Sequence, residues 1–86
     1  MGLRDLPLAG GARHVAAFKH AGWVVVRIKG AHHIMERDGV ENHLAVPCHK
    51  GTDMSRALLS GLIDAAGMTE ADYCDHFHKR IPRVDP

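Results

Sequence analysis

The sequence has little of several features that would point to whole classes of protein. Its 86 residues include only two cysteines, and aromatic residues make up 5%. We therefore expect neither a disulfide framework nor an aromatic ladder that reads unpaired RNA bases. The formal net charge is only +1, so the chain lacks the broad basic character of a general nucleic-acid-binding protein. No run is long enough to span a membrane and no basic-then-apolar segment opens the chain, so we expect a cytoplasmic protein.

The length leaves room for one domain with a small hydrophobic core, and such a core gives modest stability unless a partner covers part of the surface. The last eight residues contain two prolines and little to bury. We assign residues 1–78 to the domain and predict that residues 79–86 form a frayed tail.

Positive charge is concentrated in the first half of the chain. Residues 11–50 carry six basic residues against three acidic ones, the basic ones being Arg13, Lys19, Arg27, Lys29, Arg37 and Lys50. This excess predicts that the strand region, rather than the whole surface, meets a nucleic acid.

Two Ala-Gly pairs mark predicted helix ends. A helix over residues 12–21 would place Gly22 at the left-handed position after the helix and Trp23 against Phe18. The same arrangement recurs at Gly67, with Met68 falling on Ile63. A second helix is predicted over residues 54–66 from its apolar spacing, with Thr52 or Asp53 as its cap. A third begins at Thr69, followed by Asp72 in a capping-box pattern.

Three strands are predicted between the helices, over residues 23–28, 31–37 and 43–46, because Pro47 removes a ladder donor. Asp38-Gly39 favours a two-residue hairpin turn. That turn would set His33 opposite Leu44 and His32 opposite Ala45, with His43 diagonal to His32. His33 would then face the helices, and His32 would lie on an open face of the sheet. The fold class is therefore α+β, with a three-stranded antiparallel sheet covered by helices on one face.

The most informative segment joins the first two strands and contains Lys29, Gly30, Ala31 and His32. Glycine lets a phosphate backbone approach closely, lysine supplies positive charge, and histidine exchanges protons near neutral pH. RNA cleavage through the neighbouring 2′-hydroxyl needs a base, charge stabilisation at phosphorus and a proton for the departing 5′-oxygen. These residue types are suited to that reaction without a metal.

The chain resembles the HicA family of toxin-antitoxin messenger-RNA endonucleases over residues 6 to about 77. The segments that carry the resemblance are Ala21-Gly22-Trp23, Lys29-Gly30-Ala31-His32-His33, Val46-Pro47-Cys48-His49 and Ala66-Gly67-Met68. The resemblance implies a double-stranded-RNA-binding-domain-like α-β-β-β-α topology and a metal-independent endoribonuclease without cofactors. It also implies a HicB-type antitoxin that covers the His32 face.

The resemblance places His32 in the catalytic position. Together with the local charges, it predicts substrate contacts from Arg27, Lys29, Gly30, His49 and Lys50. One position departs from the family pattern, which commonly has serine or threonine where this chain has Ala31. If that hydroxyl helps hold a phosphate, the chain is a slower nuclease or an inactive variant.

Other interpretations stay open. His32 taken alone fits a surface histidine beside a turn, and His33 fits a partly buried structural role. His14 and His20 are expected to be solvated on the first helix. The histidine and cysteine spacing does not favour a metal site, because adjacent pairs diverge in a strand and no Cys-x₂-Cys unit exists. A non-catalytic RNA-binding module and a small protein-interaction domain are the alternatives to a nuclease.

Overall fold

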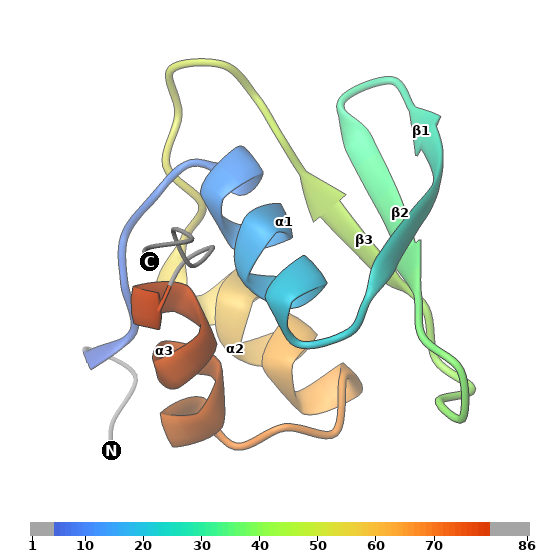
Figure 1. Ribbon diagram of the computed structural model, residues 1–86. Helices are drawn as coiled ribbons and strands as arrows, with labels where there is room; N and C mark the ends of the chain where they lie inside the picture. The colour runs from blue at the N-terminus through green and yellow to red at the C-terminus, as the bar shows by residue number, and fades with distance from the viewer. Residues whose placement is uncertain (1–4, 80–86) are drawn as a thin grey trace, which may run out of the picture.

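The computed structural model describes residues 5–79. Its elements are α1 (Gly11–His20), β1 (Val24–Lys29), β2 (His32–Glu36), β3 (Leu44–Pro47), α2 (Arg56–Ala65) and α3 (Glu70–Lys79). The strands form one antiparallel sheet in the order β1-β2-β3, and the helices gather beside it (Figure 1). This confirms the α+β class and the predicted order of elements. The predicted tail covers residues 79–86, and apart from Lys79, the last residue of α3, it lies outside the described residues.

Both predicted helix ends are confirmed. Gly22 has φ +102°, and the amide of Trp23 donates to the carbonyl of Phe18 with an N···O distance of 2.9 Å. Gly67 has φ +76°, and the amide of Met68 donates to Ile63 at 3.2 Å. Glycine is favoured at both positions because other residues are strained at positive φ. The tryptophan ring then packs edge-on against Phe18 with centroids 6.4 Å apart.

The two later helices begin where side-chain oxygens cap them. The hydroxyl of Thr69 accepts from the amide of Asp72 at 3.0 Å, as the sequence predicts. The cap predicted for α2 was wrong. Ser55 holds that position and accepts from Leu58 at 3.1 Å, so α2 starts two residues later than predicted. Ser55 caps α2 because it lies in an extended conformation directly before the first helical residue, whereas Thr52 and Asp53 lie earlier in the chain.

The register between β2 and β3 differs from the prediction by two residues. His33 lies opposite Val46 rather than Leu44, and His32 lies opposite Pro47 rather than Ala45. A turn does form at Asp38-Gly39, with the amide of residue 40 bonded to the carbonyl of residue 37 at 3.1 Å. The chain then continues through residues 41–43 before β3 begins. Because a strand repeats every two residues, this shift leaves the predicted inward and outward faces unchanged.

The core lies between the sheet and the helices. From the sheet it takes Met35, Leu44 and Val46, all at most 1% exposed, and the two aromatic residues Phe18 and Tyr73 are fully buried. Residues on α1 and α3 make the most extensive helix contact, which Figure 1 shows as two neighbouring helices. The sheet is therefore covered on one face and leaves the other open.

His14 contradicts the expectation that it is solvated. Its side chain is fully buried, and its Nδ1 lies 2.6 Å from the hydroxyl of Tyr73 on α3. Burial lowers the pKa of His14 to about 4 and raises the pKa of Tyr73. Both side chains are therefore neutral at pH 7, and the hydrogen bond joins α1 to α3 inside the core. His20, by contrast, is exposed, as expected.

Candidate active site

The hairpin between β1 and β2 closes with a two-residue turn at Gly30 and Ala31. Lys29 pairs with His32 across the turn, and Gly30 has φ +59°. A positive φ at the first turn residue is what a two-residue hairpin requires and what glycine supplies. No atom lies within 4 Å of the place where a Cβ would stand on Gly30. The backbone at this turn is therefore open to a ligand.

The two adjacent histidines of β2 point to opposite faces. His32 is exposed on the open face, directly across from Lys29. His33 is half-buried between Ile28 and Val46, and among the described residues its buried Nδ1 has no hydrogen-bond partner. The orientations predicted from the sequence are thus confirmed: His32 meets solvent, while His33 contributes to packing.

His49 reaches the same face from the segment that leaves β3. The amide of Cys48 donates to the carbonyl of Ala31 at 2.8 Å, which extends the pairing one residue beyond Pro47. Alternation along this extended segment turns His49 toward the open face. The rings of His32 and His49 stand edge to face with centroids 6.4 Å apart. Two residues that are seventeen positions apart are therefore neighbours at the open end of the sheet.

Gly11 fixes where this segment lies. A Cβ on Gly11 would stand 2.0 Å from the carbonyl oxygen of Pro47 and 2.8 Å from the Cα of Cys48. The first turn of α1 can therefore approach the backbone before His49 only because residue 11 has no side chain. Gly10 adds a β-bridge to Asp53. Nothing in the local sequence around these two glycines indicates this contact.

The remaining predicted contacts lie further from His32. Arg27 pairs with Ile34 after a bulge at Val26, and it lies two residues before Lys29 on β1. Lys50 follows His49 and is exposed. The structure thus brings Lys29, Gly30, His32 and His49 together. It places Arg27 on the adjoining part of the sheet and Lys50 beside the loop.

The cysteine next to His49 is not an activated nucleophile. Burial raises the pKa of the Cys48 thiol, and its Sγ lies 3.6 Å from the carbonyl oxygen of Val46. A protonated thiol is a poor nucleophile, because the reactive form is the thiolate. The chemistry available at this end of the sheet is therefore that of the imidazoles and the lysine.

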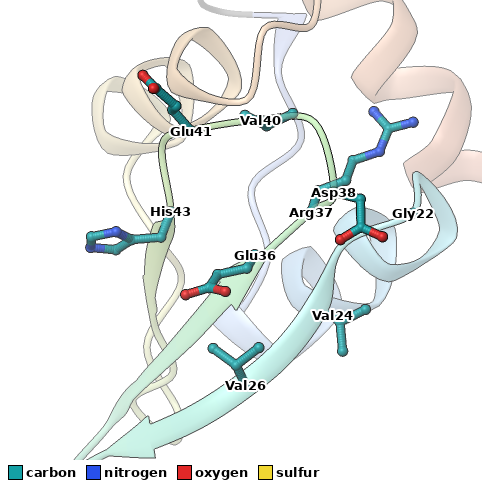
Figure 2. Close-up of a pocket in the computed structure, with 9 residues that line it drawn as sticks. All are labelled: Gly22, Val24, Val26, Glu36, Arg37, Asp38, Val40, Glu41 and His43. Atoms are coloured by element: carbon teal, nitrogen blue, oxygen red, sulfur yellow. The ribbon is translucent and has the colours of Figure 1, made fainter.

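The other end of the open face has the opposite electrostatic character. A shallow hollow of about 740 Å³ lies over the start of β1 and the loop before β3 (Figure 2). Val24, Val26 and Val40 line it together with three carboxylates. These belong to Glu36, Asp38 and Glu41.

His43 also lies in this hollow, which corrects the prediction that it is diagonal to His32. The reason is the longer loop, which moves the start of β3 toward the Glu36 end of β2. Across the open face, Lys29, His32 and His49 occupy the turn end, and the three carboxylates occupy the loop end together with Arg37 and His43.

Within residues 5–79, no three histidine, cysteine, aspartate or glutamate side chains are grouped so as to hold a metal ion. No helix in the same range is both long and apolar enough to cross a bilayer.

Comparison with known families finds a match over most of the chain. Residues 11–68, which are 58 of the 86 residues, match the family described as "HicA toxin of bacterial toxin-antitoxin". The matched range begins at Gly11, which lies against the backbone before His49. It ends at Met68, whose amide bonds to the carbonyl of Ile63 at the end of α2. A search of curated proteins finds no match.

Proposed function

This chain belongs to the HicA toxin family of bacterial toxin-antitoxin systems, and we propose that it acts as an endoribonuclease. Its substrate is messenger RNA in the cytoplasm, and cleavage of that RNA inhibits translation. The observation that carries the proposal is the exposed imidazole of His32 at the turn, with Lys29 directly opposite and the ring of His49 beside it. The antitoxin partner that the family implies completes the module.

The arrangement suits a scissile phosphate at the turn. His32 is placed to exchange a proton with the RNA, because histidine changes its charge near neutral pH. The Lys29 ammonium and the open backbone at Gly30 are placed to stabilise negative charge at phosphorus. Arg27 and Lys50 add positive charge along the path of the neighbouring phosphates. No metal ion is required for this route through the 2′-hydroxyl.

The partner is a HicB-type antitoxin that covers the open face and blocks RNA. Two observations support this surface. Val24 and Val26, which line the hollow on the open face, are 58% and 51% exposed, which is unusual for an apolar strand without a partner. The carboxylates of the hollow repel RNA, so this end of the face is suited to a protein with basic and aliphatic side chains.

A non-catalytic RNA-binding module of the same fold is the second candidate. Ala31 favours it, because the family commonly carries a hydroxyl at this turn position. The two candidates share RNA binding and differ only in cleavage.

One experiment separates them. The wild type, His32→Ala and the control His43→Ala are purified and incubated with one RNA in excess EDTA, and each is also induced in cells without antitoxin. The nuclease proposal predicts cleavage and growth arrest for the wild type and for His43→Ala, and neither for His32→Ala. His43 is a matched control because it is an exposed histidine at the other end of the same face. Full activity of His32→Ala, or loss of wild-type cleavage with EDTA, contradicts the mechanism.

A further inference from the structure

We propose that His49 is a second catalytic residue, so that His32 and His49 divide the two proton transfers of RNA cleavage between them. One imidazole takes the proton from the attacking 2′-hydroxyl, and the other gives a proton to the departing 5′-oxygen. The inference rests on the endoribonuclease function proposed above and deepens it. The sequence predicts only a substrate contact for His49, whereas the geometry gives it a role in the reaction.

The separation of the two rings fits a shared phosphodiester. A proton-transfer group must lie within about 2.6–3.2 Å of its own oxygen. The attacking and leaving oxygens occupy opposite sides of phosphorus in an in-line displacement, so the two groups cannot touch each other directly. Ring centroids 6.4 Å apart, in planes 81° to each other, leave space between the imidazoles while keeping both within reach of one phosphate.

The ring nitrogens of these two residues are available. Among the described residues, neither His32 nor His49 makes a side-chain hydrogen bond, and both are exposed. Other histidines of the chain are engaged: His14 bonds Tyr73, and the Nδ1 atoms of His20 and His76 lie 2.8 Å apart. Within residues 5–79, the pair beside Lys29 is therefore the only pair of contacting imidazoles whose ring nitrogens make no hydrogen bond.

The fold also holds the pair in place from both sides. The amide of Cys48, the residue directly before His49, donates a hydrogen bond to the carbonyl of Ala31, the residue directly before His32. On the other side, the first turn of α1 lies against the backbone of Pro47 and Cys48 at Gly11. Fixed spacing of two reacting groups is what catalysis by positioning requires, because a small displacement costs rate.

The reaction balances with these groups alone. The 2′-oxygen forms a bond to phosphorus as its proton passes to a neutral imidazole. The bond from phosphorus to the 5′-oxygen breaks as that oxygen takes a proton from the other imidazole, which starts as imidazolium. The products are a 2′,3′-cyclic phosphate and a 5′-hydroxyl. The two imidazoles finish with exchanged protonation states, and proton exchange with water restores them.

The test uses a leaving group that needs no proton. Wild type, His32→Ala, His49→Ala and the control His43→Ala are assayed on an RNA oligonucleotide with one cleavable ribonucleotide, and on the same oligonucleotide with sulfur in place of the scissile 5′-oxygen. Each catalytic variant should lose about 10²- to 10⁴-fold in rate on the oxygen substrate, and His43→Ala should match the wild type. The sulfur substrate should restore only the variant that lacks the general acid, because a thiolate departs unprotonated.

Two further readouts distinguish catalysis from binding. The pH-rate profile of the wild type should be bell-shaped, and each single variant should lose one limb. Affinity for the oligonucleotide with a 2′-deoxy residue at the scissile position should change less than about threefold in His49→Ala. A loss of affinity that accounts for the whole loss of rate would return His49 to a binding role and overturn the inference.

The outcomes also separate this inference from the proposed function. If wild type cleaves while His49→Ala retains its rate and a bell-shaped profile, the inference is wrong and the endoribonuclease function stands. If the sulfur substrate rescues neither variant, the division of proton transfers is likewise refuted. If the wild type cleaves neither substrate, the endoribonuclease function itself fails and the inference fails with it. Thermal unfolding of every variant verifies that it is folded.

Discussion

The backbone amide of Cys48 donates a hydrogen bond to the carbonyl of Ala31 with an N···O distance of 2.8 Å. This single bond connects the turn that carries His32 with the segment that carries His49. Both histidines are exposed, so neither is held by burial of its own side chain. Their relative position therefore depends on the backbone around them, and the first prediction concerns the residue that seats that backbone.

Gly11→Ala should lower stability and cleavage together. The added Cβ would stand 2.0 Å from the Pro47 carbonyl oxygen, so α1 and the His49 segment must move apart. Overpacking of this kind costs typically about 1–3 kcal/mol. The matched control is Gly61→Ala in α2, where the new Cβ meets no atom within 4 Å.

Alanine is favoured over glycine inside a helix by about 0.5–1 kcal/mol, so Gly61→Ala should raise the melting temperature and leave cleavage unchanged. Thermal unfolding and a cleavage assay measure both effects. A Gly11→Ala protein with wild-type stability would contradict the seating role of Gly11.

Stability should fall on acidification because of His14. The pKa of this residue is lowered from 6.5 to about 4 in the folded chain, mainly by burial. The unfolded chain therefore binds more protons between these values, and the free energy of unfolding decreases as pH falls from about 6.5 toward 4. The full effect approaches about 3 kcal/mol.

His14→Gln keeps a hydrogen-bonding side chain beside Tyr73 but does not titrate. Urea unfolding of wild type and variant from pH 7.5 to 4.5 isolates the contribution of His14, since all other groups titrate in both proteins. The variant should show a shallower dependence of stability on pH. Parallel curves would mean that His14 is not the cause.

Ala31→Ser should raise cleavage if the hydroxyl common in the family helps position a phosphate. A net hydrogen bond contributes about 0.5–1.5 kcal/mol, which corresponds to roughly a 2- to 10-fold increase in rate. Ala45→Ser places the same change on an exposed residue of β3 and should have no effect. Steady-state cleavage of one RNA by the three proteins is sufficient, and equal rates would remove Ala31 as the reason for any weak activity.

RNA binding should depend on salt with a modest slope, because few basic residues lie at the turn end of the open face. Each phosphate contact contributes about −0.7 to the slope of log affinity against log salt concentration for a single strand, and we expect roughly two to four contacts. In a His32→Ala background that prevents cleavage, Lys29→Ala should reduce the slope by about 0.7. Lys19→Ala, on α1, should leave it unchanged. A salt-independent affinity would argue against binding through phosphates.

The antitoxin should protect the open face from amide exchange. Val24 and Val26 are exposed on the face of the sheet that also carries His32. Protection is therefore expected across residues 24–36 when a purified HicB-type antitoxin is added. Mass spectrometry of exchange with and without the partner measures this directly. The first turn of α2 serves as an internal reference. Protection confined to α3 would place the interface elsewhere.

Much of the fold could be predicted from the sequence because its signals are local. Gly22 and Gly67 end their helices through backbone angles that other residues resist, and the bonds they close span only five residues. The opposite orientations of His32 and His33 follow from the two-residue repeat of a strand. They were therefore predicted correctly although the predicted register was wrong by two residues. The resemblance to the family rested on these same short segments.

Only the tertiary structure decided the relationships between distant residues. His14 lies four residues before Phe18 and so on the buried face of α1, but its hydrogen-bond partner Tyr73 is 59 positions away, with the hydroxyl at 2.6 Å, and only the tertiary structure supplies it. The loop before β3 is longer than the Asp38-Gly39 turn requires, so the turn by itself did not set the register. Likewise, His49 meets His32 because Gly11 lets a helix approach the backbone after β3. Local propensity limits each segment to a few conformations, but the packing of segments against one another selects which side chains become neighbours.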